Sequence, residues 1–248
     1  MKQLGQQVCS GTEDMSKEFD TLFKQFMLNP LSFNIGSDLI ETKNNLGETL
    51  FHYFVIENCI EETTILLNLG ANINPVDQFG STPLQTSAMI GNTEMLRWLL
   101  DNGADPLYQE EESGYTALFY SLTHNQHDCI KVLLENENVD PNQMYQNDRS
   151  LSMAVAYSAD GESYKLLHEA GAKIFEYKNS IGLSAISVLV TNDNYEALKY
   201  LLTIIEDRDI NKFILNNEFS SILQDNNKSS RLLFEAGLTG DWTGGYDY

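Results

Sequence analysis

Apolar residues in the middle of the chain follow helical spacing in short runs that glycine and proline interrupt. In GSTPLQTSAMIGNTEMLRWLLDNGAD, residues 80–105, Thr82 is a suitable N-cap, and Pro83 takes the first helical position, where a missing N–H is tolerated. We predict a first helix from this cap to about Ile90, ended by Gly91 in a left-handed conformation.

The second half of this segment predicts another helix, over about residues 93–102, with Gly103 just past its end. Its apolar residues lie on one helical stripe: Met95, Leu96, Leu99 and Leu100. Two short antiparallel helices cannot bury their apolar faces by themselves. The unit therefore needs a neighbour on each side.

The same pattern occurs five times. The units begin at Gly47, Gly80, Gly114, Asp148 and Gly182, so successive starts are 33 or 34 residues apart. A constant period of this length predicts stacked helical units in one elongated solenoid domain, where each unit contacts only its neighbours.

The motif of each unit resembles the ankyrin repeat, whose pattern is G-x-T-P-L-H, a glycine between two helices, and a closing L-L-x-x-G-A. GSTPLQ keeps this opening, with Gln85 at the histidine position, and GETLFH keeps Gly47, Thr49 and His52. LLNLGAN, LLDNGAD and LLHEAGA match the closing signature. The resemblance implies an all-α ankyrin-repeat solenoid with β-hairpin finger loops, and a structural role for His52 between neighbouring repeats.

Three repeats depart from the pattern. The third has Ala117 at the proline position and Glu137 at the closing glycine. The fourth has no opening glycine and has Ser150 in place of threonine, while the fifth loses the closing Gly-Ala. The resemblance covers about residues 44–206.

The ends of the array are expected to be caps, because a solenoid must shield its last apolar faces. An amphipathic helix is indicated by Phe19, Leu22, Phe23, Phe26 and Met27. We expect a flexible N-terminus at 1–14, caps at 15–43 and 208–238, a tail at 239–248, and repeats at 44–76, 77–110, 111–144, 145–178 and 179–207.

Composition narrows the choice of partner. The net charge of −21 and the pI of about 4.3 disfavour nucleic acid and anionic membranes, and favour a basic protein partner. No apolar run reaches 18 residues and the N-terminus has no apolar signal-peptide region, while three scattered cysteines suit a reducing compartment. We predict a cytoplasmic protein that is monomeric on its own.

The histidines and cysteines, which could take part in catalysis or bind a metal, do not form a recognisable catalytic motif. His168 precedes Gly171, where it suits a helix C-terminus. His124, His127 and Cys129 are close enough in sequence to suggest a metal cluster, although solvated loop histidines are favoured. The sequence therefore predicts no catalytic residue, metal or cofactor, and an enzyme remains the remote alternative.

The resemblance implies that finger loops and the late positions of first helices face a partner. The residues expected to bind are Phe79, Ser81, Met89, Ile90, Gln109, Glu112, Tyr115, His124, Gln146, Arg149, Tyr157 and Tyr177. Six of them are large and apolar or aromatic, as interface anchors are: Phe79, Met89, Ile90, Tyr115, Tyr157 and Tyr177. Glu110, Glu111 and Glu112 form an acidic cluster on one of these loops.

Two functions fit these expectations. The first is an inhibitor that masks a basic protein, with a bacterial immunity protein that blocks a toxin as its concrete form. The second is a scaffold or adaptor, or a secreted effector, that links proteins without inhibiting them.

Overall fold

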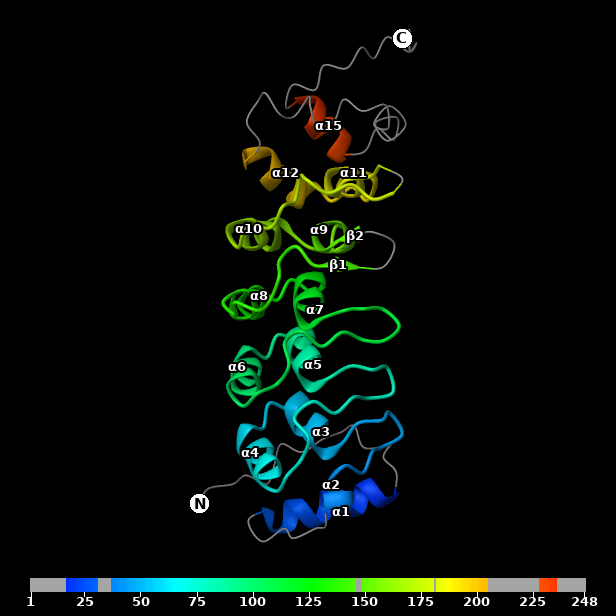
Figure 1. Ribbon diagram of the computed structural model, residues 1–248, viewed down its shortest axis with the longest axis vertical. Helices are drawn as coiled ribbons and strands as arrows, with labels where there is room; N and C mark the ends of the chain where they lie inside the picture. The colour runs from blue at the N-terminus through cyan, green and yellow to red at the C-terminus, as the bar shows by residue number, and fades with distance from the viewer. Residues whose placement is uncertain (1–16, 31–36, 146–148, 181, 205–227, 236–248) are drawn as a thin grey trace.

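The computed structural model describes residues 17–30, 37–145, 149–180, 182–204 and 228–235. The chain forms an elongated all-α solenoid with the N- and C-terminal segments at opposite ends (Figure 1). Its helix pairs are α3 (Leu50–Ile56) with α4 (Ile60–Asn68), α5 (Pro83–Ile90) with α6 (Thr93–Asp101), α7 (Ala117–Thr123) with α8 (His127–Leu134), α9 (Leu151–Ala154) with α10 (Gly161–Glu169), and α11 (Ala185–Thr191) with α12 (Tyr195–Ile204).

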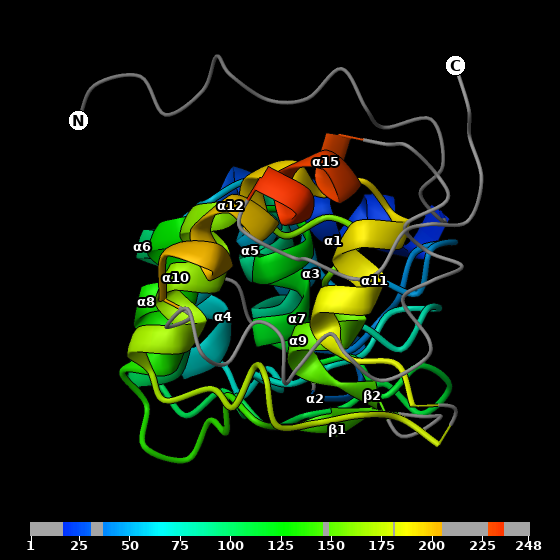
Figure 2. The same ribbon diagram turned by 90° about the horizontal axis from the view of Figure 1, so that it is seen from above.

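The pairs stack into two columns. The first helix of each pair belongs to an inner column, made of α3, α5, α7, α9 and α11. The second helix of each pair belongs to an outer column, made of α4, α6, α8, α10 and α12 (Figures 1 and 2). The loops that connect one pair to the next project beyond the inner column on one side, and we call them fingers (Figure 1). One finger contains the short hairpin of β1 (Met144–Tyr145) and β2 (Arg149–Ser150), with Tyr145 opposite Arg149.

Each inner helix begins at a threonine or serine that the sequence pattern places there. The hydroxyl of Thr82 accepts the N–H of Gln85, and the Gln85 side chain accepts the N–H of Thr82 at 2.8 Å. Thr49 with His52, and Ser184 with Ser187, form the same reciprocal cap. Gly91 ends α5 in the left-handed conformation, with φ of 84°, so the predicted limits of this helix are confirmed.

In the first two inner helices the third residue also links neighbouring units. The Nε2 of His52 lies 3.4 Å from the carbonyl oxygen of Ser81, and the amide of Gln85 donates to the carbonyl of Tyr115 at 2.8 Å. Both bonds reach the next finger, which confirms the bridging role expected for His52. In the third unit Phe119 takes this position, and the hydroxyl of Tyr145 lies 3.1 Å from Thr116 Oγ1 in its place.

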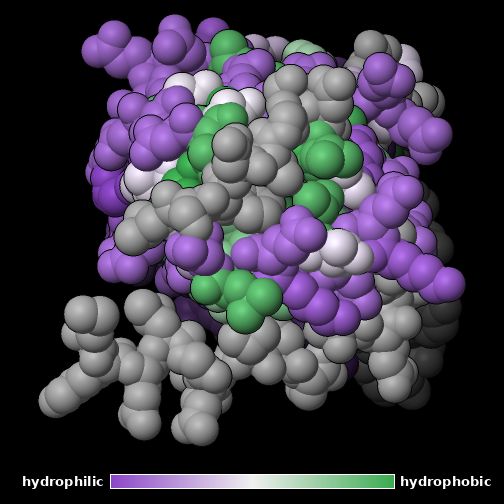
Figure 3. All heavy atoms as spheres, turned by 90° about the horizontal axis from the view of Figure 1, so that it is seen from below, coloured by the Kyte–Doolittle hydropathy of each residue, from purple (hydrophilic) through white to green (hydrophobic). Residues whose placement is uncertain are grey.

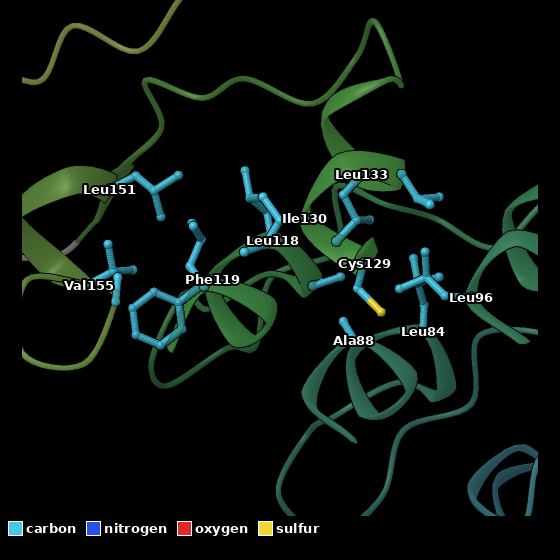
Figure 4. Packing of buried hydrophobic residues seen from close by; sticks show 14 of the residues in the cluster. Leu84, Ala88, Leu96, Leu118, Phe119, Cys129, Ile130, Leu133, Leu151 and Val155 are labelled. Atoms are coloured by element: carbon cyan, nitrogen blue, oxygen red, sulfur yellow. The ribbon is translucent and has the colours of Figure 1, made fainter. Parts of the chain in front are cut away.

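The core lies between the two columns. Met95, Leu96 and Leu99 on α6 are completely buried, whereas Leu100 is half-buried. Leucine, isoleucine and alanine side chains of neighbouring units meet along this line, with Cys129 among them (Figure 4). Burial on both sides of a unit explains why the units need each other.

The ends are covered as a capped solenoid requires. Four residues of α1 (Lys17–Leu28) are buried: Phe19, Leu22, Phe23 and Phe26. The rings of Phe23 and Phe26 reach α3, with centroids 6.0 Å and 5.1 Å from that of Phe54. The short α2 (Ser37–Ile40) follows α1, and α15 (Lys228–Glu235) packs on α11 and α12 with Leu233 buried. The expected segments 1–14, 208–227 and 239–248 lie outside the described residues.

Amide side chains at the turns between inner and outer helices tie adjacent units together. Asn92 donates to the carbonyl of Ile56 at 3.4 Å, and Gln126 to that of Met89 at 3.1 Å. Asn125 donates in the other direction, to Ser158 at 3.1 Å. The third unit thus hydrogen-bonds to both neighbours at this edge.

Candidate functional site

The finger turns are held by their own side chains. Asp77 Oδ1 accepts the N–H groups of Phe79 at 2.8 Å and Ser81 at 2.9 Å. Asn44 Oδ1 does the same for Leu46 and Glu48 in the loop between α2 and α3. We count this loop as the first finger, so that Asp77 lies on the second finger and Glu110 on the third. These bonds fix the backbone at the finger tips before any partner arrives.

Two neighbouring finger tips expose apolar side chains. Phe79 is 72% exposed and Leu46 is 37% exposed, and each stands directly before the glycine of its turn. The N–H of Gln78 donates to the carbonyl of Leu46 at 3.0 Å, so the two fingers are joined. Sequence reasoning missed Leu46, although its position before Gly47 matches that of Phe79 before Gly80.

Tyr115 is not the exposed anchor that its position predicted. Its ring stacks on Phe119, with centroids 3.7 Å apart and an interplanar angle of 7°, and it lies near Tyr145. It is half-buried and packs against the core. Ser81 is likewise used inside the chain, because its carbonyl faces His52 and its hydroxyl donates to Glu110.

The three residues of the predicted acidic cluster at 110–112 differ in their exposure to solvent. Glu111 and Glu112 are exposed, but Glu110 is buried and its carboxylate accepts three hydroxyl groups. These come from Ser81 at 2.6 Å, Ser113 at 2.5 Å and Tyr120 at 2.6 Å. Burial and the carboxylate that accepts its proton raise the pKa of Tyr120. Glu110 therefore fastens the third finger to the second one.

A second set of exposed side chains lies at the C-terminal ends of the inner helices. Tyr157 is 63% exposed and Ile90 is 41% exposed, whereas Met89 is half-buried. His124 is exposed, and its Nδ1 lies 3.0 Å from the carbonyl oxygen of Tyr120.

The remaining predicted binding residues are spread along the fingers. Gln109 and Glu112 are exposed, while Arg149 and Tyr177 are half-buried. Gln146 lies outside the described residues. The exposed large side chains consequently form two groups: a finger row of Leu46 and Phe79 on adjacent fingers, and a helix row of Ile90 and Tyr157, which belong to the second and fourth units.

The histidine–cysteine segment does not converge on one point. His127 is not a solvated loop residue, because it opens α8 and its Nε2 lies 3.0 Å from each carboxylate oxygen of Asp160. Burial raises the pKa of Asp160, but hydrogen bonds from Ser163 and His127 outweigh it and leave the pKa below its ordinary value. Cys129 is buried, with its sulfur 3.3 Å from Thr93 Oγ1.

Residues 17–30, 37–145, 149–180, 182–204 and 228–235 offer no metal site. These residues contain no group of three or more His, Cys, Asp or Glu side chains placed to hold a metal ion. Among the same residues, every helix is too short or too polar to cross a lipid bilayer. Viewed from the N-terminal end, the surface is mainly hydrophilic with separate hydrophobic areas (Figure 3). Leu28 and Leu39 of the cap are exposed.

A family model described as ankyrin repeats in three copies matches residues 20–110 and 51–145, which together span half of the chain. The chain belongs to the ankyrin-repeat family. The fourth and fifth ankyrin units lie largely beyond these matches, yet they form the same helix pairs as the first three.

Several ankyrin proteins are similar to this chain. The probable 26S proteasome regulatory subunit p28 of Saccharomyces cerevisiae is 28% identical over 37% of the chain and 40% of its own length. Mouse inversin is 31% identical over 60% of the chain and 14% of its own length. The E3 ubiquitin-protein ligase KEG of Arabidopsis thaliana is 25% identical over 71% of the chain and 11% of its own length. The chain thus spans less than half of each of these relatives.

Ankyrin repeats bind other proteins, so this chain is a protein–protein interaction module. Members of the family are generally non-enzymatic interaction domains, and enzymes such as a ubiquitin ligase carry them as one part of a longer chain. The residues of the finger row and the helix row are among the large side chains that the described part of the chain exposes.

Proposed function

We propose that this chain binds a basic protein through its fingers and inner-helix ends, and inhibits that protein by covering it. The observation that carries the proposal is the exposure of Phe79 and Tyr157 on a chain with a net charge of −21. Large aromatic side chains at the centre of an interface supply most of its binding energy, and charged residues around them select the partner.

The two rows suit one extended interface. Fully burying a side chain such as Phe79 or Ile90 contributes about 1.5–3 kcal/mol. An inner helix of eight residues such as α5 is about 12 Å long, since each residue adds about 1.5 Å. A partner that contacts both rows therefore covers the inner helices between them, which is enough to block an active site.

The charge supports a basic partner. An excess of carboxylates raises the association rate of a cationic protein and repels acidic ones. Nucleic acid and anionic membranes are excluded from the proposal for the same reason. Three cysteines scattered along the sequence suit a reducing compartment, so we propose that the protein is cytoplasmic.

The concrete form of this function is an immunity protein, a monomer on its own that forms a stoichiometric complex with a basic toxin. The experiment combines the purified chain with the product of a neighbouring gene, where that product is basic. The mass of the complex and the activity of the partner are measured between about 50 and about 300 mM salt, because exposed charges are screened over this range.

We expect a one-to-one complex, loss of the partner's activity, and an affinity that falls as salt rises. Phe79→Ala and Tyr157→Ala should each weaken the complex at least tenfold, or about 1.4 kcal/mol. The outer-helix variant Leu69→Ala is the matched control, because Leu69 is 38% exposed but belongs to neither row. An affinity unaffected by salt would contradict the electrostatic part of the proposal.

A second candidate function is that of an adaptor. It is favoured by the separation of the finger row from the helix row, since two partners can occupy them independently. The same experiment distinguishes the two functions: an adaptor forms the complex but leaves its partner fully active, and Phe79→Ala and Tyr157→Ala then affect different partners.

A further inference from the structure

The outer helices carry their charges in columns that follow the repeat. Four cations occupy one equivalent position on successive outer helices: Arg97, Lys131, Lys165 and Lys199. Carboxylates occupy the position three residues before each of them: Glu94, Asp128, Glu162 and Glu196. Acidic and basic columns therefore run side by side along this face.

These columns neutralise each other. Lys131 pairs with Asp128 and Lys165 with Glu162, each at 3.2 Å. Arg97 reaches across to Glu135 of the next unit, also at 3.2 Å. These ion pairs offset part of the negative charge of the outer face.

The first fingers have a different balance. Asp77 and Glu111 take part in no ion pair within the part of the chain that the structure describes. Ser81 of the second finger donates to Glu110 of the third at 2.6 Å, so the loops that carry Asp77 and Glu111 are joined. Burial, followed by the charges of Glu111, Glu110 and Asp77, raises the pKa of Tyr108, which lies between Asp77 and Glu111 in sequence. Lys43 lies on the first finger, and its ammonium donates to the carbonyl of Val76 at 2.7 Å.

The apolar tips of the first two fingers, Leu46 and Phe79, lie next to these carboxylates of the second and third fingers. Phe79 is 72% exposed, yet its backbone is fixed by Asp77 and its finger is bonded to that of Leu46. A pre-ordered tip loses little conformational entropy on binding. Exposed aromatic rings also attract cations over their faces, and the attraction increases when water is excluded.

We infer that the first three fingers bind a basic segment of the partner, in which an arginine or lysine meets Asp77, Glu111 and the ring of Phe79 while an adjacent apolar side chain packs on Leu46. A neutral apolar segment would leave the two carboxylates desolvated without a counter-charge, which is unfavourable. A basic segment without apolar residues would leave Phe79 and Leu46 in water. This inference rests on the proposed function and specifies the partner's chemistry at the finger row.

The test uses four synthetic peptides of equal length as probes: arginine with leucine, arginine with serine, glutamine with leucine, and glutamate with leucine. Binding to the full chain is measured by fluorescence anisotropy at several salt concentrations. We expect the arginine–leucine peptide to bind at least tenfold more tightly than the other three. Phe79→Ala and Leu46→Ala should each remove most of this advantage.

Charge variants isolate the electrostatic part. Asp77→Asn keeps the finger turn, because Asn44 Oδ1 already accepts the equivalent N–H groups in the first finger. Asp77→Asn combined with Glu111→Gln should flatten the salt dependence of peptide binding. Glu94→Gln combined with Glu162→Gln removes as many charges from the outer face, and should leave that dependence unchanged.

Three results would overturn the inference: no peptide binds, the glutamine–leucine peptide binds as tightly as the arginine–leucine peptide, or the outer-face variants have the same effect as the finger variants. Other results distinguish a failure of this inference from a failure of the proposed function. If a basic protein is inhibited but Phe79→Ala has no effect on the complex, the inference is wrong and the function stands. If the peptide result is as expected but the partner stays active, the inhibitor proposal is wrong.

Discussion

His52 should make the first repeat sensitive to acid. Its ring is buried between Thr49 and the next finger, and burial lowers its pKa from 6.5 to about 4, despite the opposing effect of the Ser81 carbonyl. The neutral form of the His52 ring is therefore favoured more in the folded protein than in the unfolded chain. The resulting stability is complete above pH 6.5 and is lost as the pH falls from 6.5 to 4.

The magnitude follows from the two pKa values. The difference between 6.5 and about 4 corresponds to about 3 kcal/mol, because each tenfold change in proton affinity is worth about 1.4 kcal/mol. Other groups also titrate in this range, so a matched variant is needed. His52→Gln provides it, since Gln85 makes the same cap and the same link to the next finger without a titrating ring.

The assay is urea unfolding of both proteins at pH 8 and at pH 4, followed by circular dichroism and by fluorescence. With Trp242 replaced by phenylalanine, Trp98 reports on the first two repeats, because its ring lies 6.4 Å from that of Phe51. We expect the free energy of unfolding of the wild type, relative to His52→Gln, to fall by about 3 kcal/mol on acidification. A relative stability that stays constant with pH, or rises in acid, would refute the argument.

Glu110→Ala should destabilise the chain by about 2–4 kcal/mol, because it removes three hydrogen bonds to a charged acceptor, whereas the exposed neighbour Glu111→Ala should change stability by under about 0.5 kcal/mol in urea unfolding. Gly80→Ala should lower the free energy of unfolding by about 1 kcal/mol, because the φ of Gly80 is 82°. Gly47→Ala should lower it by about 3 kcal/mol, because the added Cβ would lie 2.5 Å from the backbone nitrogen of Gln78. Equal shifts of the melting temperature for the two variants would contradict this. Tyr145→Phe should cost about 1 kcal/mol by losing its hydroxyl contacts between units, measured by chemical unfolding, and no loss would show that water replaces them.

Local features of the fold could be predicted because they depend on residues within one turn of each other. The caps at Thr49 and Thr82, the stop at Gly91 and the buried face of α6 all have this property. The period of 33 or 34 residues then determined how the pairs stack. Even the degenerate Ser184 opens a capped helix, so the rule tolerates a change of residue.

The candidate site was harder to predict because its side chains are either exposed to solvent or in contact with residues of neighbouring repeats, and the local sequence does not distinguish these cases. Glu110 was expected in solvent, but one of its hydroxyl donors, Ser81, is 29 residues away. Tyr115 was expected at a partner interface, but its ring packs against those of Phe119 and Tyr145. Exposure of Phe79 followed directly from its place at a turn tip.

Some of the missed contacts do have a signal in the sequence. His127 and Asp160 are 33 residues apart, close to one period, so both fall at the turn between two helices in adjacent units. The cations of the outer column recur at intervals of 34 residues. Comparing equivalent positions along the array, rather than neighbours along the chain, would have revealed both.

The third repeat lacks both the proline and the closing glycine of its family, yet it is tied to its neighbours by more side-chain bonds than its motif suggests. Glu110 fastens it to the second unit, while Asn125, His127 and Tyr145 connect it with the fourth. A pulling force on the two chain ends should therefore unravel the terminal units first and meet its greatest resistance at the middle of the array. The weakest-looking unit by motif would then act as the mechanical anchor of the whole molecule.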